Sequence, residues 1–212
     1  MSSEKRKYEL KARAEAQERT RHRIAAAASD LHEEVGVART TVAEIARRAG
    51  VQRLTVYNHF PGLTELLPAC SAHYLALHPQ PDFGAALSLD DPRQGVRQAL
   101  VDLYRWYRET EAIQLHVQGE RATVPELEDW MARTADLSLG QLASGLAAGF
   151  GLPGKRAEPL RALIAVALGF WTWHRLSQEG LDDVPAADLM AESVGAVALA
   201  MSGEAPPAAA VR

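Results

Sequence analysis

The sequence predicts an all-α protein, and three observations support that prediction. Apolar residues recur every three or four positions along most of the 212 residues, which is the spacing of helices that bury one face. No segment alternates apolar and polar residues as a half-buried strand does. Residues that start or stop helices bracket the apolar segments, with Asp91 and Pro92 at a predicted start and Gly36 and Gly50 at predicted ends.

The N-terminal residues 4–23 favour a helix but have no apolar face. They are rich in Glu, Lys, Arg and Ala, so we interpret them as a solvated extension of the first helix. The alternative is a basic arm that touches phosphates, formed by Arg6, Lys7, Arg19, Arg21 and Arg23. Interleaved glutamates weaken the positive field of such an arm, which favours the solvated extension. From Ile24 an apolar stripe continues the helix to Val35.

Residues 41–60 have the pattern of a helix-turn-helix. Thr41 and Glu44 form a predicted capping box, in which each side chain accepts a hydrogen bond from the backbone amide of the other. The helix that starts there ends at Gly50, because glycine adopts positive φ freely. A second helix, from about Gln52 to Asn58, is predicted to turn inward the apolar residues Val51, Val56 and Phe60. It leaves outside the polar residues Gln52, Arg53, Thr55 and Asn58.

An ordered set of residues in this region resembles the TetR family of bacterial transcriptional regulators. The matching residues are Thr41, Ile45, Ala46, Gly50, Val51, Thr55, Tyr57, His59, Phe60 and Pro61. The resemblance is strong from about Arg21 to Leu77, and beyond that it is architectural only. It implies an N-terminal three-helix helix-turn-helix DNA-binding domain joined to a larger C-terminal helical bundle for ligand binding and dimerisation.

The outward side chains of the second helix are of types that read base edges. Arg53 is the predicted contact to guanine, and Gln52 or Asn58 could pair with adenine. Leu54 could touch a thymine methyl, or it could merely fill space. Thr55 completes this group of predicted DNA-binding residues.

Other contacts to DNA are expected at phosphates, where they set position rather than read sequence. The resemblance implies that Thr41, Tyr57 and His59 make them. The family often has a lysine early in its fourth helix for a further phosphate, and this chain has Leu63 there. That interaction is therefore absent or made elsewhere.

Charge is distributed unevenly along the chain. The net charge is −4, but residues 1–62 hold 12 Lys and Arg against 8 Asp and Glu, and the remainder holds 11 against 19. A basic N-terminal part, residues 1–62 (the head), followed by an acidic remainder (the body) suits a protein that places one end against phosphates. Solvated helix faces that simply differ in sign are the alternative, and charge alone does not separate the two interpretations.

The rest of the chain is predicted to be helical with one clear linker. Pro61 suits the first turn of a fourth helix, which ties the head to the body, and residues 78–91 break the periodicity. Further helices are predicted at about 92–111, 112–122, 125–149, 155–179 and 186–202. The predicted domains are a solvated extension at 1–20, a DNA-binding domain at 21–77, an effector-binding and dimerisation domain at 78–202 and a disordered tail at 203–212.

The two last predicted helices, 155–179 and 186–202, together look like half of a four-helix dimer interface. The first is apolar around most of its circumference, and the second mixes small with large apolar residues, which permits close approach. The resemblance to TetR proteins places subunit pairing there as well. A purely internal core is the alternative.

An aromatic group with accompanying histidines occupies the body. In TetR-like proteins the equivalent region encloses a pocket for a small, largely apolar effector. The ligand-binding residues expected on that basis are Tyr104, Trp106, Tyr107, His116, Trp130, Phe170, Trp171 and His174. Each aromatic residue is favoured as core over ligand wall, so the prediction concerns the region.

Enzyme, cofactor and metal chemistry find no support. Gly149, Gly151 and Gly154 match a GxGxxG spacing, but this run joins two predicted helices and is interpreted as a turn. His73 and His78 are placed too far around a helix to chelate one metal. The lone Cys70 is interpreted as a packed side chain, with an oxidation sensor as the alternative. We therefore expect no catalytic residue, no cofactor and no metal.

Location is predicted from two absences. The first residues lack the apolar core of a secretion signal, and the longest apolar run, 162–173, is shorter than the roughly 20 residues of a membrane span. We expect a cytoplasmic protein without a membrane partner.

The preferred hypothesis is a homodimeric repressor that binds a double-stranded DNA operator and is released by a small, largely apolar effector. A helical enzyme or small-molecule carrier with a vestigial head is a competing class. A module that uses the same helix-turn-helix to bind a protein is the third. Strongly salt-dependent duplex binding would favour the first.

Overall fold

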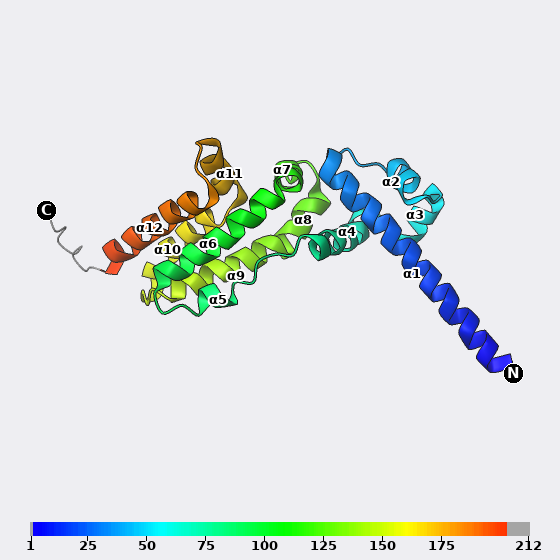
Figure 1. Ribbon diagram of the computed structural model, residues 1–212, viewed down its shortest axis with the longest axis horizontal. Helices are drawn as coiled ribbons and strands as arrows, with labels where there is room; N and C mark the ends of the chain where they lie inside the picture. Colours follow the sequence, from blue (N-terminus) through cyan, green and yellow to red (C-terminus); the bar gives the residue numbers. More distant parts are fainter. Residues whose placement is uncertain (1, 203–212) are drawn as a thin grey trace. The chain divides into compact units, whose positions relative to one another are not determined.

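The computed structural model describes the backbone of residues 2–202 and the side chains of residues 7–202. Every regular element in that part of the chain is a helix (Figure 1), which confirms the predicted fold class. The first seven are α1 (Ser2–Val35), α2 (Val42–Ala49), α3 (Arg53–His59), α4 (Leu63–Leu77), α5 (Gly84–Leu87), α6 (Pro92–Glu109) and α7 (Glu111–Glu120). There follow α8 (Pro125–Arg133), α9 (Ala135–Ala148), the 3-10 turn η1 (Gly154–Arg156), α10 (Ala157–Ala167), α11 (Phe170–Gln178) and α12 (Asp183–Ser202). The predicted tail at 203–212 lies outside the described residues.

The chain divides into two compact units. The first comprises Met1–Pro79 and Ala112–Met131, and the second comprises Gln80–Glu111 and Ala132–Arg212. The domain boundary predicted after residue 77 lies close to the first division. Helices α7 and α8, which the sequence prediction placed in the C-terminal domain, instead group with the first unit.

Glu120 ties α7 to the turn that follows α1. Its carboxylate accepts a hydrogen bond of 2.9 Å from the backbone amide of Ala38. Gly36 lies in the same turn with φ of +88°, and a side chain at this position would collide with the Glu120 carboxylate. The end of α1 therefore requires glycine for its backbone conformation, and any other residue there would displace the Glu120 carboxylate.

The core of the first unit lies where α1 packs against α2 and α4. The predicted stripe on α1 is confirmed, because Ile24, Ala28 and Leu31 are buried and Val35 is half-buried. Helices α2, α3 and α4 complete this core with Ile45, Ala46, Ala49, Val56, Leu66, Leu67 and Tyr74, together with Phe60 just after α3.

The second unit is built around α6, which packs against α12, while α9 packs against α10. Its largest fully buried side chains include Leu100, Tyr104, Leu160, Ile164 and Trp173. Asp91 caps α6 as predicted, since its carboxylate accepts a 2.9 Å hydrogen bond from the amide of Arg93. These interactions give the unit a continuous apolar core.

The predicted single helix at 155–179 is in fact two helices. Helix α10 ends before Leu168, and Gly169 is extended with φ of −71° and ψ of 137°. The break leaves carbonyls of the last turn without helical partners. The buried hydroxyls of Tyr104 and Tyr107 donate to two of them, at 2.7 Å to Ala167 and 2.9 Å to Leu168. Contacts from α6 therefore stabilise the break between α10 and α11, which the apolar periodicity of the sequence does not reveal.

Other boundaries also differ from the sequence prediction. The predicted helix at 125–149 is interrupted at Thr134 and forms α8 and α9. Helix α4 begins at Leu63, so Pro61 precedes the helix instead of occupying its first turn. The predicted linker contains the short helix α5, and α12 begins at Asp183 instead of Ala186.

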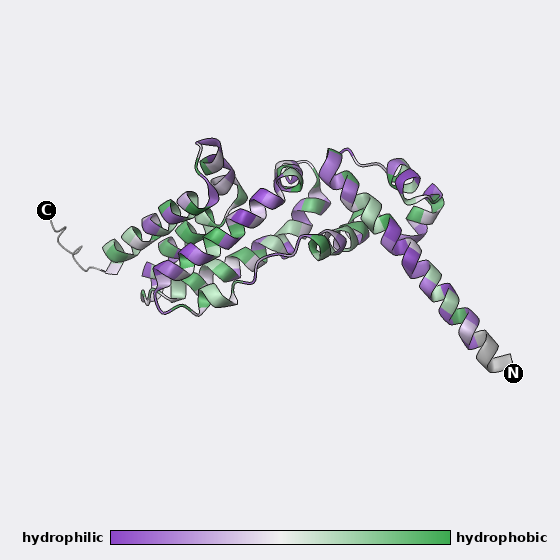
Figure 2. Cartoon of the chain, viewed as in Figure 1, coloured by the Kyte–Doolittle hydropathy of each residue, from purple (hydrophilic) through white to green (hydrophobic). Residues whose placement is uncertain are grey.

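Hydropathy differs along the described helices (Figure 2). Hydrophilic residues recur along residues 7–23 of α1, whereas hydrophobic residues dominate much of α10 and α12. By length and composition, α12 is the single described helix that could cross a membrane, with 33% of the tested window buried. Its buried residues, which include Ala187, Ala191 and Val194, belong to the core of the second unit.

Candidate nucleic-acid interface

The first helix of the helix-turn-helix begins at a side-chain cap. The Thr41 hydroxyl accepts a hydrogen bond of 3.2 Å from the amide of Glu44. The reciprocal half of the predicted capping box is absent among the described contacts, because the Glu44 carboxylate instead pairs with Arg47. The helix ends at Gly50 as predicted, with φ of 65° and ψ of 41° in the left-handed region.

The turn presents the predicted reading helix, α3, to solvent. Val56 on α3 and Phe60 after it are buried and Val51 is half-buried, so the apolar edge faces the core. Gln52 is the N-cap residue and α3 runs from Arg53 to His59, one residue later at each end than predicted. The exposed side chains on the other edge are Gln52, Arg53, Leu54, Tyr57 and Asn58, and Thr55 is half-buried.

Leu54 is the unusual member of this exposed edge. Its side chain is 66% exposed, whereas the apolar residues on the opposite edge of α3 are covered. The alternative interpretation, that Leu54 fills space within the head, does not fit this exposure. An exposed apolar side chain between polar ones suits contact with a thymine methyl.

Arg21 on α1 fixes the C-terminal end of α3. Its guanidinium donates a hydrogen bond of 2.8 Å to the His59 carbonyl and lies 4.1 Å from the centroid of the Phe60 ring. The first contact satisfies a carbonyl that the end of the helix leaves without a partner. From the sequence we considered Arg21 only as a phosphate contact and missed this role. The 38 residues between the two partners leave no local signal for it.

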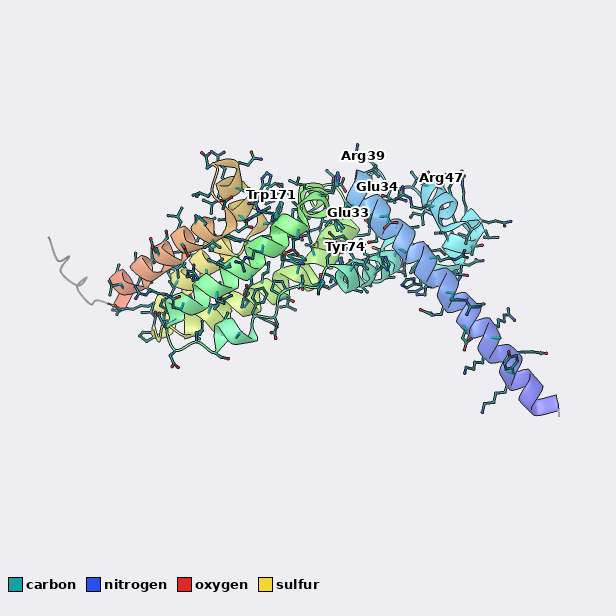
Figure 3. The ribbon with its side chains drawn as sticks, viewed as in Figure 1. Glu33, Glu34, Arg39, Arg47, Tyr74 and Trp171 are labelled. Atoms are coloured by element: carbon teal, nitrogen blue, oxygen red, sulfur yellow. The ribbon has the colours of Figure 1, made fainter. Side chains whose placement is uncertain are left out.

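Two other arginines of the head are held by carboxylates. Arg48 donates to both oxygens of Glu34, at 2.6 and 2.7 Å, and Arg47 pairs with Glu44. Figure 3 labels one member of each pair, Glu34 and Arg47. These hydrogen bonds lower the pKa of the two glutamates and raise the pKa of the two arginines. Arg53 differs from them, because no side chain among residues 7–202 forms an ion pair or hydrogen bond with it. Its guanidinium is available for an external partner.

The three predicted phosphate contacts have suitable donors. Tyr57 is 51% exposed, so its hydroxyl can reach a neighbouring molecule. Thr41 is exposed, and because its oxygen accepts the cap hydrogen bond, its hydroxyl proton can be donated elsewhere. His59 is half-buried, with its carbonyl already bound by Arg21.

A buried polar pair lies between α1 and α4. His32 on α1 places Nδ1 3.6 Å from the Sγ of Cys70 on α4, and both side chains are buried. Burial lowers the pKa of His32 to about 4 and raises the pKa of the Cys70 thiol to about 12. Both groups are therefore neutral near pH 7. The buried, protonated thiol fits the packed-side-chain interpretation of Cys70 better than an oxidation sensor.

The residues predicted to line an effector pocket are divided between the two units. Tyr104, Trp106, Tyr107 and Phe170 are buried in the core of the second unit. Burial raises the pKa of both tyrosines, whose hydroxyls are bound to the carbonyls at the α10–α11 break. Trp171, by contrast, is 50% exposed.

Of the other predicted residues, His174 adjoins that core, whereas His116 and Trp130 belong to the first unit. His174 is half-buried, stacks on Phe170 at 5.6 Å and places Nε2 3.7 Å from a Glu111 oxygen. His116 on α7 and Trp130 on α8 belong to the first unit instead. The structure therefore distributes the predicted set over two units.

A polar cavity lies elsewhere in the second unit. It has a volume of about 340 Å³ and is lined by Arg93, Gln94, Arg97, Asp188, Ala191 and Glu192 of α6 and α12. Arg97 and Asp188 bond to each other across it at 2.6 Å. None of the predicted aromatic residues lines this cavity.

The glycine-rich run behaves as a turn. Gly151 and Gly154 have φ of 65° and 53°, and the run connects α9 with η1 and α10. A dinucleotide fingerprint needs a preceding strand, and a helix precedes this run. The interpretation as a helix–helix connection is confirmed.

Comparison with known proteins gives a family match in the head and fold matches over most of the chain. The sequence pattern of "Bacterial regulatory proteins, tetR family" matches residues 24–70. The HTH-type transcriptional regulator SrpR of Pseudomonas putida is 47% identical over 77 residues, which are 35% of this chain and 36% of that protein. The chain thus matches little more than a third of the length of this curated relative.

Solved structures extend the likeness of fold beyond the head. A transcriptional regulator from Rhodococcus sp. Rha1 matches with a TM-score of 0.58 and 23% identity over 88% of this chain and 99% of its own. NalD of Pseudomonas aeruginosa, described as the secondary repressor of the MexAB-OprM multidrug efflux pump, matches with a TM-score of 0.54 and 22% identity over 86% of this chain and 96% of its own. At this identity the two structures show the fold alone. The sequence match thus places a TetR-type DNA-binding head at residues 24–70, and the solved structures show a similar fold over most of the chain.

Proposed function

We propose that this protein binds operator DNA in a sequence-specific manner, with α3 in the major groove. The observation that carries the proposal is the exposed edge of α3, where Arg53 and Leu54 stand between Gln52 and Asn58. The left-handed Gly50 sets the turn before this edge, and Arg21 fixes the far end of the helix. A short helix held at both ends presents its side chains in one defined orientation, which base reading requires.

Each proposed base contact follows from the chemistry of one side chain. Arg53 donates two hydrogen bonds to guanine O6 and N7, and Gln52 or Asn58 bonds the edge of adenine. Leu54 packs against a thymine methyl. A good bidentate contact discriminates against the wrong base by roughly 1 to 3 kcal/mol. Thr41, Tyr57 and His59 bond phosphates and set the register.

We also propose that the protein acts as a homodimer that pairs through α10 and α12. Both helices carry large apolar side chains that the single chain does not cover, with Val166 at 58% and Leu189 at 46% exposed. Exposed apolar side chains of this kind suit burial against a second copy of the chain in two-fold pairing. A symmetric dimer presents two copies of α3, which suits a near-palindromic operator with half-sites about one helical turn apart.

The regulatory proposal is repression that is relieved by a small, largely apolar effector. Such an effector would favour the conformation in which the two heads are wrongly spaced, and it could shift the population only by its difference in affinity for the two states. Helix α4 is the last helix of the head before the chain enters the second unit, so it is the proposed lever. Of the predicted set, Trp171 is exposed and His116, Trp130 and His174 are half-buried, so these four remain accessible in part.

Two substitutions on the same helix test the assignment of α3. Arg53→Ala should remove most of the preference for the operator over scrambled duplex, while total DNA binding persists. Tyr57→Phe is the matched comparison, and it should weaken binding to specific and random duplex by a similar factor, because a phosphate contact carries no sequence information. Fluorescence anisotropy with both duplexes gives the two ratios. Full operator discrimination by the Arg53→Ala protein would defeat the proposed role of Arg53.

A further inference from the structure

The positive charge of the head is confined to one segment. Residues 1–23 contain 8 Lys and Arg against 4 Asp and Glu, whereas residues 24–62 contain 4 of each. The helix-turn-helix and the part of α1 that supports it are therefore neutral as a group. The whole excess of positive charge in residues 1–62 belongs to the N-terminal part of α1.

The cations of the helix-turn-helix are also largely occupied. Arg47 and Arg48 pair with glutamates, and the Nε of Arg39 donates to the Val35 carbonyl at 2.8 Å. Arg53 is assigned to a base. Duplex DNA carries about one negative charge per 1.7 Å of its axis, and its neutralisation supplies most of the sequence-independent affinity. The helix-turn-helix of this chain holds few free cations for that purpose.

The N-terminal part of α1 leaves the head at the proposed DNA-contacting edge. Arg21 joins α1 to the carbonyl of His59, two residues from Tyr57, so the helix passes the end of α3 at this point. The side chains of residues 7–19 are all exposed, and the helix continues beyond α2 and α3 (Figure 1). With a rise of 1.5 Å per residue, residues 7–20 extend about 20 Å past the anchor, the length of about six base pairs.

We propose that this α1 extension, residues 7–20, is a second DNA contact that lies along the phosphates flanking each half-site. The inference rests on the proposed function of α3. It assigns to the extension the sequence-independent phosphate binding for which the neutral helix-turn-helix has few free cations. Lys7, Arg13 and Arg19 are its candidate contacts, because no carboxylate among residues 7–202 pairs with them. Lys11 lies 3.9 Å from Glu15 in an exposed pair, a longer and weaker contact than the hydrogen-bonded pairs of Arg47 and Arg48, so it stays available to a phosphate.

The composition of the extension favours DNA over a second helix as its partner. Tyr8 and Leu10 are exposed but two positions apart, which places them about 200° apart around the axis. A coiled coil needs apolar residues that repeat along one seam, and the extension has none. Its cations are spread around the axis, so a polyanion can be contacted without one particular rotation of the helix.

Matched neutral variants of the full chain test the proposal. One variant carries Lys7→Gln, Arg13→Gln and Arg19→Gln, and the control carries Glu9→Gln, Glu15→Gln and Glu18→Gln. Glutamine has nearly the helix propensity of the residues it replaces, and circular dichroism verifies that the helix content is kept. For operator duplex, the slope of log K against log salt should fall by about 0.9 for each phosphate that the variant no longer neutralises. The control should keep the slope or steepen it.

Duplex length gives an independent readout. Shortening the flanks of the operator from about ten base pairs to none should weaken the unaltered protein and the control, but not the cation-depleted variant. An unchanged salt slope in that variant, with operator preference retained, would overturn the inference and leave the proposed function standing. Failure of the unaltered protein to prefer any duplex sequence would instead contradict the proposed function. If the cation-depleted variant lost binding to an acidic protein or to anionic vesicles while its salt slope on DNA stayed unchanged, the extension would belong to another partner. That result would also overturn the inference.

Discussion

Protonation of His32 should loosen the head well before general acid unfolding begins. The imidazole is buried, its Nε2 has no hydrogen-bond partner among the described residues, and its Nδ1 faces the thiol of Cys70. Burial raises the pKa of that thiol to about 12, so Cys70 is neutral and supplies no negative charge to an imidazolium.

The size of the effect follows from the two pKa values of His32. Burial lowers its pKa in the folded protein from 6.5 to about 4. Between these values the unfolded chain binds a proton that the folded chain does not, so folding stability falls as the pH falls. Above pH 6.5 this contribution vanishes, and at pH 5 it amounts to a loss of about 2 kcal/mol. That loss corresponds to roughly a 30-fold change in the opening equilibrium.

Hydrogen exchange of the full-length protein measures this loss where it occurs. Protection factors for peptides from the C-terminal half of α1 and from α4 should drop about 30-fold more between pH 7 and pH 5 in the unaltered protein than in a His32→Leu variant. Leucine fills a similar volume and cannot titrate, so other groups that titrate in this range contribute equally to both proteins. Equal pH dependence in the two proteins would refute the reasoning.

Three further predictions concern contacts that hold the helices in place. In hydrogen exchange, Arg21→Ala should lower the protection of α3 amides by about 2 kcal/mol, because it removes the hydrogen bond and the cation–π interaction. Arg21→Lys should have an intermediate effect, and unaltered α3 protection would contradict this role. Tyr104→Phe and Tyr107→Phe should each destabilise the second unit by about 1 to 3 kcal/mol in thermal unfolding, because a buried carbonyl loses its donor; a neutral double variant would show that the break is held otherwise. Val166→Asp with Leu189→Asp should yield monomers in sedimentation, and a persistent dimer would exclude α10 and α12 as the subunit contact.

Much of the helix-turn-helix could be predicted because the residues that determine it lie close together in the sequence. The Thr41 cap, the left-handed Gly50 and the inward positions of Val56 and Phe60 depend on residues within a few positions of one another. The second half of the capping box failed for a local reason as well. Arg47 competes successfully for the Glu44 carboxylate, and a charged pair on a helix surface is an alternative that the motif itself does not reveal.

Features set by distant contacts could not be predicted from the pattern. The break between α10 and α11 depends on tyrosine hydroxyls more than 60 residues away. The grouping of α7 with the first unit reflects the Glu120 hydrogen bond to an amide 82 residues earlier. The predicted effector residues remain a prediction about a region, since composition cannot tell an aromatic core from an aromatic pocket.

The central claim, that α3 reads DNA in a symmetric pair, is tested most directly by selecting bound duplexes from a random pool with the full-length protein. We predict an enriched inverted repeat whose half-sites lie about one helical turn apart, and whose recovery is abolished by Arg53→Ala. A pool that shows no enriched sequence after repeated rounds, or a site recovered equally well by the Arg53→Ala protein, would contradict the claim.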